Sequence, residues 1–155
     1  MNKNNLNEKK SIKYSNKFSY FDPPITNTTP KKDPVNLEDV YEYITDPKNQ
    51  LASHTVEYRH ELENGFVTTA SEAKKKFPYV TYSSVCASRS SAGFVSHSGL
   101  IALDCDKVQG FDAKKREVCN DPVLSPKLVH TTASGKGMRV VIAVDGGEDL
   151  HLAYF

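Results

Sequence analysis

The chain has 155 residues, of which 38% are hydrophobic and 25% charged, which is enough for one domain with a core but too little for two of ordinary size. Its formal net charge is +1, so the whole molecule does not attract polyanions, and a nucleic acid would have to contact local patches. No stretch approaches the roughly 20 apolar residues that cross a bilayer, and the N-terminus lacks the apolar segment of a secretion signal. We therefore expect a cytoplasmic protein with no membrane partner.

The first half of the chain predicts a tail, one strand and three helices. Residues 1–16 are rich in Asn and Lys and nearly lack apolar side chains, so they cannot bury enough surface to offset the entropy of ordering. The elements expected after this disordered tail are a strand at 18–21, a helix capped by Asn36 and ended by Pro47, a helix at about 49–60 and a short helix at 71–76.

The second half predicts mainly strands. These are 79–86, a central strand 100–104, 128–132 and 138–144, with a polar loop at 88–98 that carries Arg89, a basic helix at 112–119 and a glycine turn at 133–137. Residues 148–155 begin like a helix but have no cap, so we expect a domain at 17–155 that is incomplete at its C-terminus. The pattern indicates an α+β fold with a mostly antiparallel sheet packed by helices.

Two carboxylates follow the apolar strand, at Asp104 and Asp106. Residues two apart in a strand point to the same face, so the two side chains would lie together and repel each other unless a cation shares the site. Oxygen ligands suit Mg²⁺ or Mn²⁺. The alternative is that Asp106 starts a turn and that Asp104 meets solvent at the strand end. The three cysteines form no Cys-x-x-Cys pair, which argues against a zinc site.

A glycine turn follows two dozen residues later, at Ser134, Gly135, Lys136 and Gly137. Its amide groups could point at phosphate oxygens, with Lys136 as a mobile positive charge, although the spacing is not that of a Walker A loop. In the next strand Arg139 interrupts an apolar pattern and could hold phosphate. His130, on the preceding strand, could reach the same cleft. An ordinary hairpin turn, an arginine facing water and a structural histidine remain the alternatives.

These residues resemble the VirE N-terminal-type domain, a primase-like module of the archaeo-eukaryotic primase superfamily from bacterial mobile elements, over most of 18–155. The resemblance implies an RRM-like sheet, Mg²⁺ or Mn²⁺ at Asp104 and Asp106, and nucleoside triphosphates bound at Ser134–Gly137 and Arg139. It also implies a DNA template and a helicase domain or protein as partner. The weaker matching positions Arg59 and Lys76 are, with His130 and Arg89, expected nucleic-acid contacts.

The sequence therefore favours a metal-dependent, primase-like nucleotidyltransferase domain of a DNA replication protein. Primases of the superfamily usually carry His where Arg139 stands, and a third acidic motif would lie beyond Phe155, so an inactive copy of such a domain is also consistent with the sequence. A non-catalytic module that binds single-stranded DNA or a partner domain is the second hypothesis, and a purely structural interaction domain is the third.

Overall fold

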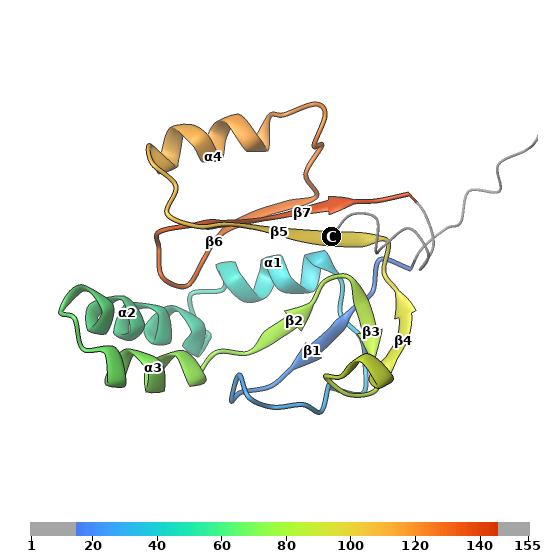
Figure 1. The fold of residues 1–155 in the computed structure, drawn as a ribbon, viewed down its shortest axis with the longest axis horizontal. Coiled ribbons are helices and arrows are strands. Elements are labelled where there is room, and N and C mark those ends of the chain that lie inside the picture. Colours follow the sequence, from blue (N-terminus) through green and yellow to red (C-terminus); the bar gives the residue numbers. More distant parts are fainter. Residues whose placement is uncertain (1–14, 146–155) are drawn as a thin grey trace, which may run out of the picture.

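The computed structural model describes residues 15–145, which form the α+β fold that the sequence predicts (Figure 1). The predicted tail, except for its last two residues, and the helix start predicted at 148–155 lie outside the described residues. The elements are β1 (Ser19–Phe21), α1 (Leu37–Thr45), α2 (Gln50–Glu63), α3 (Val67–Lys75), β2 (Tyr79–Thr81), β3 (Ser84–Cys86), a 3-10 turn η1 (Ser91–Gly93), β4 (Phe94–His97), β5 (Leu100–Cys105), α4 (Phe111–Cys119), β6 (Leu128–Thr131) and β7 (Met138–Ala143).

The largest sheet has three antiparallel strands in the order β5-β7-β6. The strand β5, which the sequence predicts to be central, is therefore at an edge of this sheet, and β7 is central. The unbroken apolar run of β5 is explained by the helices that cover both faces of the sheet, because α4 lies over one face and α1 under the other (Figure 1). The sheet places the polar C-terminal end of β5 beside the start of β7.

The remaining strands form two short antiparallel pairs, β1 with β2 and β3 with β4. The single strand predicted at 79–86 is wrong, because the chain turns at Tyr82 and Ser83 and its two halves pair with different partners. Ser98 holds this turn, since its hydroxyl donates to the Tyr82 carbonyl at 2.5 Å and its amide donates to the Ser83 carbonyl at 3.0 Å. The predicted loop 88–98 likewise contains a strand, β4, and the 3-10 turn.

The helices α1 and α2 lie close to their predicted positions, whereas α3 is longer than predicted. Asn36 caps α1 with a complete capping box, in which the Asn36 amide donates to the Asp39 carboxylate at 2.7 Å. The helix α3 begins at Val67, four residues earlier than predicted, after Gly65 turns the chain with a φ of 72°. The helices α2 and α3 pack together around Tyr58, Ala70 and Phe77.

The main core lies between α1 and the three-stranded sheet. Buried side chains from both halves of the chain meet there: Phe18, Val40, Tyr82, Leu100 and Val141. Phe18 and Tyr82 pack with ring centroids 5.0 Å apart. This core fixes α1 against the same sheet face from which the polar side chains of β5 and β7 project. Among the helices of residues 15–145, none is long and apolar enough to cross a membrane.

Replacement of Phe18 by Ala should therefore destabilise the whole domain. Phe18 is 0% exposed and contacts the core cluster, so its loss should lower the free energy of unfolding by about 3–5 kcal/mol. Urea unfolding measures the change. Val95→Ala is the matched control, because Val95 is 60% exposed and should change the free energy by less than about 0.5 kcal/mol. Equal effects of the two substitutions would contradict this core.

Candidate functional site

A row of three polar residues crosses the three-stranded sheet. Asp104 on β5 stands opposite Arg139 on β7, and Arg139 stands opposite His130 on β6. Paired residues in antiparallel strands project from the same face, so the three side chains lie next to one another. The adjacent apolar row, Ala102, Val141 and Leu128, belongs to the core. The face therefore changes from apolar to charged within two residues of each strand.

Asp104 and Arg139 form a bidentate ion pair. Arg139 Nε donates to Asp104 Oδ1 at 2.6 Å and Nη2 donates to Oδ2 at 2.7 Å. The hydrogen bond from Arg139 lowers the pKa of Asp104, and the same contact raises the pKa of Arg139. Asp106 adds to the negative field that raises the Arg139 pKa. Arg139 is thus the positive charge that compensates the two acids.

His130 and Tyr82 form the other end of the row. His130 Nδ1 lies 3.1 Å from the Thr131 carbonyl oxygen, and Nε2 lies 3.2 Å from the Tyr82 hydroxyl. A carbonyl can only accept, so Nδ1 carries the proton and Nε2 accepts from Tyr82. Burial lowers the pKa of His130 and raises the pKa of Tyr82 to about 12. Both groups are therefore neutral at neutral pH.

The glycine turn between β6 and β7 lies beside the acids. A Cβ on Gly137 would meet the Cys105 carbonyl oxygen at 2.5 Å and Asp106 Oδ1 at 3.3 Å, so only glycine allows this approach. Arg59 of α2 anchors the turn, because its Nε donates to the Ala133 carbonyl at 2.9 Å. A Cβ on Gly135 would lie 3.1 Å from the same Nε.

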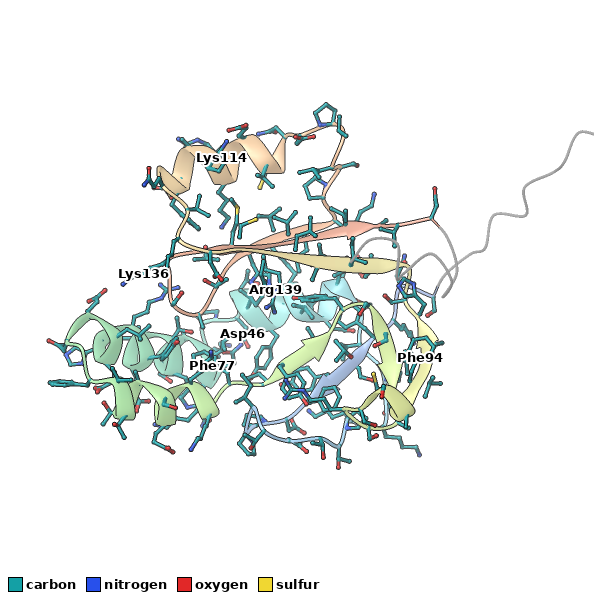
Figure 2. All side chains as sticks on the ribbon, in the orientation of Figure 1. Asp46, Phe77, Phe94, Lys114, Lys136 and Arg139 are labelled. Atoms are coloured by element: carbon teal, nitrogen blue, oxygen red, sulfur yellow. The ribbon has the colours of Figure 1, made fainter. Side chains whose placement is uncertain are left out.

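Two amide groups of the turn are used within the turn itself. The Gly135 amide donates to the Thr132 carbonyl at 2.9 Å, and the Lys136 amide lies 3.4 Å from the Ser134 hydroxyl. Because these donors are used within the turn, a phosphate in the cleft would contact side chains instead. Lys136 itself is exposed at the tip of the turn (Figure 2).

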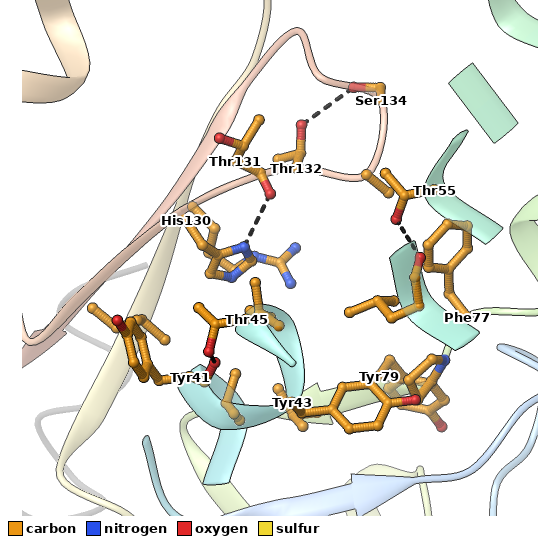
Figure 3. A pocket seen from close by; sticks show the side chains of 18 of the residues that line it. Tyr41, Tyr43, Thr45, Thr55, Phe77, Tyr79, His130, Thr131, Thr132 and Ser134 are labelled. Carbon is orange, nitrogen blue, oxygen red and sulfur yellow. Dashed lines mark hydrogen bonds between the residues drawn. The ribbon is translucent and has the colours of Figure 1, made fainter. Parts of the chain in front are cut away.

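The row and the turn line one cleft of about 1140 Å³ between the sheet and the helices α1 and α2 (Figure 3). The predicted site residues that line it are Arg59, Asp104, Asp106, His130, Ser134 and Arg139. Figure 3 shows His130 pointing from its strand toward α1 across the cleft. The structure thus brings Arg139 and the two acids together, and Ser134 lines the same cleft. The acids are partly open to solvent at the strand end, and Arg139 faces the cleft rather than bulk water.

Five predicted site residues do not line the cleft. Of the turn, Gly135, Lys136 and Gly137 are absent from the lining of the cleft, and Gly137 is buried against β5. Lys76 pairs with Glu57 at 2.6 Å, and Arg89 lies over the Tyr79 ring at 4.4 Å and donates to the Ile25 carbonyl. The nucleic-acid contacts predicted for Lys76 and Arg89 would therefore form a surface separate from the cleft.

Sequence reasoning missed two residues of the site. Tyr82 contacts His130 and places its ring 6.0 Å from the Arg139 guanidinium, yet no spacing links it to residues so far along the chain. Lys115 of α4 lines the cleft and donates to the Thr131 hydroxyl at 3.2 Å. The sequence marked Lys115 only as part of a basic patch.

The donor set of Asp104 and Asp106 fits a hard divalent cation, since Mg²⁺ is commonly held by one or two carboxylates together with substrate phosphates. Residues 15–145 contain no group of three or more His, Cys, Asp or Glu side chains that could hold a metal ion. A cation here would therefore depend on a ligand for part of its coordination.

Comparison with known proteins gives one family. The model of the BT4734-like N-terminal domain matches residues 72–150, a span that includes the charged row and the turn but not Arg59. No curated protein and no solved structure matches the chain. The resemblance to the VirE N-terminal-type domain is therefore wrong, because the family that matches is a different one and nothing found points to a VirE or primase-like module.

Gly137→Ala should disturb the approach of the turn to β5. The added Cβ would lie 2.5 Å from a backbone oxygen, so strands must shift, at a cost of about 1–3 kcal/mol in the free energy of unfolding. Urea unfolding measures this cost. Lys136→Ala, in the same turn but exposed, should change the free energy by less than about 0.5 kcal/mol. An unchanged stability in Gly137→Ala would contradict the packing of the turn.

The stability of the domain should fall as the pH drops below about 6.5, the ordinary pKa of histidine. The pKa of folded His130 lies below that of the unfolded chain, so in this window the unfolded state binds a proton that the folded state does not, and folding is disfavoured. NMR titration of the His130 ring checks the cause. Arg139→Gln should raise the His130 pKa and Asp104→Asn should lower it further. A folded pKa above 6.5 would contradict the neutral, buried ring.

Proposed function

The chain belongs to the BT4734-like N-terminal domain family, whose model matches residues 72–150 of 155, and for this member of the family we propose the following function. The cleft binds a nucleoside triphosphate together with Mg²⁺ or Mn²⁺ and serves nucleotidyl transfer. One observation carries this proposal: Asp104, Asp106, Arg139 and Ser134 line the same cleft, so two carboxylates and a phosphate-binding arginine meet in one place.

The charges in the cleft support a phosphate-bearing ligand. Arg59, Lys115 and Arg139 line it from three different elements, and arginine guanidinium groups bind phosphate through two parallel hydrogen bonds. Ser134 and Thr132, whose hydroxyls lie 3.2 Å apart, add polar groups at the same end. Arg139 lies on β7, Lys115 contacts β6 and Arg59 contacts the turn between these strands, so a triphosphate would extend from its metal toward this side of the acids.

Exposed apolar side chains in the same cleft support a nucleoside rather than inorganic phosphate. Tyr41, Ile44 and Val56 are large apolar side chains that are exposed, and all three line this cleft. On α2, Val56 lies one helical turn before Arg59 and on the same side. A ligand that has both a charged chain and a flat apolar base fits this combination of side chains.

In the proposed reaction a terminal hydroxyl of a nucleic acid loses its proton to solvent and its oxygen attacks the α-phosphorus. The bond from the α-phosphorus to the oxygen that bridges to the β-phosphate breaks, and pyrophosphate leaves. The bound cation would stabilise charge on the phosphate oxygens. Arg59, Lys115 and Arg139 would orient the triphosphate, and Asp104 and Asp106 would hold the cation. His130 is neutral and would add no charge next to the acids.

DNA is the partner that we propose as template or primer, and a cytoplasmic location accords with these substrates. The basic helix α4 carries Lys114, Lys115 and Arg116 beside the cleft and supplies a local patch that could attract a phosphate backbone. A role in mobile elements and a helicase partner depend only on the rejected resemblance, so neither is proposed.

A non-catalytic binding module is the second candidate. Both carboxylate oxygens of Asp104 are held by Arg139, and residues 15–145 provide no third acid to complete a metal cluster. DNA affinity that persists in EDTA, falls steeply with salt and yields no extension product would favour this function over nucleotidyl transfer.

Calorimetric titration with Mn²⁺ and ATP tests the leading proposal. The wild-type chain should bind the mixture, and Asp104→Asn/Asp106→Asn should weaken this binding by about tenfold or more, since a cation loses both protein carboxylates. Asp33→Asn is the control, because Asp33 is exposed and does not line the cleft, and it should leave the heats unchanged. Equal heats for the double variant and the wild type would contradict a metal site at Asp104 and Asp106.

A further inference from the structure

Arg139 occupies the position that a cation would share with the two acids. It contacts both carboxylate oxygens of Asp104, at 2.6 and 2.7 Å, and lies within the field of Asp106. Asp104 has no carboxylate oxygen outside this bidentate contact. Each Asp104 oxygen keeps one further lone pair, but a divalent cation there would lie beside the Arg139 charge and be repelled by it, so the carboxylate is fully available to the cation only when Arg139 moves away.

The ion pair is open enough to be exchanged. The side chain of Asp104 is 51% exposed and that of Arg139 is 34% exposed, so a ligand in the cleft can reach both. Solvent at the open side screens the pair, whereas its bidentate geometry strengthens it. Separation of the pair therefore costs little only when each partner finds another opposite charge.

We propose that Arg139 is an exchangeable partner of Asp104 that makes the cleft select the complex of cation and triphosphate over either component alone. This inference rests on the proposed function. When the complex enters, Arg139 passes from the carboxylate to a phosphate oxygen, and Asp104 passes from the guanidinium to the cation. Every charge keeps a partner throughout.

Either component alone breaks this balance. A cation without a triphosphate must compete with Arg139 for Asp104, and it leaves the guanidinium without an anion. A triphosphate without a cation takes Arg139 but meets two uncompensated carboxylates, Asp104 and Asp106. The two ligands should therefore favour each other's binding, and the coupling must be equal in both directions.

The surroundings of Arg139 suit this exchange. Its guanidinium lies 6.0 Å from the Tyr82 ring. This aromatic face can contact the guanidinium both when Arg139 pairs with Asp104 and when it turns toward a phosphate. Tyr82 is fixed in the core against Phe18 and by its bond to His130. The Arg139 side chain can thus turn between Asp104 and the cleft while its strand, at the centre of the sheet, stays in place.

Two single-ligand titrations test the exchange without the complication that Mn²⁺ and ATP bind each other in solution. Mn²⁺ alone should bind Arg139→Gln about tenfold more tightly than the wild type, because the acids lose their competing cation. ATP in EDTA should bind Asp104→Asn several-fold more tightly than the wild type, because Arg139 becomes free. Lys127→Gln and Asp33→Asn, exposed residues that do not line the cleft, control for the change in net charge.

The outcomes separate the two proposals. If the wild type binds Mn²⁺ with ATP but Arg139→Gln does not exceed the Lys127→Gln control in affinity for Mn²⁺, the exchange is wrong and the proposed function stands. If the wild type binds no Mn²⁺ with ATP, both are wrong. Circular dichroism checks that Arg139→Gln is folded. If it is not, Arg139→Lys replaces it, since lysine keeps the charge without the bidentate contact and should show part of the gain.

Discussion

The pairing of β7 between β5 and β6 is the constraint on which the site depends. Its register sets Arg139 against Asp104 on one side and His130 on the other, although these residues come from three separate strands. A shift of β7 by one residue would turn Arg139 to the other face of the sheet, away from Asp104 and His130. The apolar partners of the next row, which include Val141 and Ala102 in the core, hold the register because they must stay buried.

The charged row lies directly beside the buried core. Val141 is buried and Arg139, two residues before it on the same face, reaches the cleft. Low exposure on one side strengthens the electrostatic contacts of the row, while the open side admits a ligand. The site therefore combines a rigid support with exchangeable partners, as binding of a charged ligand requires.

The two halves of the chain contribute different parts of this arrangement. The N-terminal half supplies α1, the apolar wall of the cleft and Arg59, whose bond to the Ala133 carbonyl ties α2 to the glycine turn. The C-terminal half supplies the acids, Arg139 and the turn itself. The matched family span begins within α3, so it covers the charged row, whereas the opposite wall of the cleft comes from the residues before it.

The sequence by itself determined the α+β class, most helix positions and the strands around Asp104 and Arg139, because caps, prolines and apolar periods act over a few residues. Only the tertiary structure decided that β5 is an edge strand, that residues 79–86 split into two strands, and that Tyr82 joins the site. These features depend on pairing between distant segments, and local patterns carry no information about such partners. The Asp104–Arg139 contact is of this kind: each residue was recognisable, and the fold alone made them a pair.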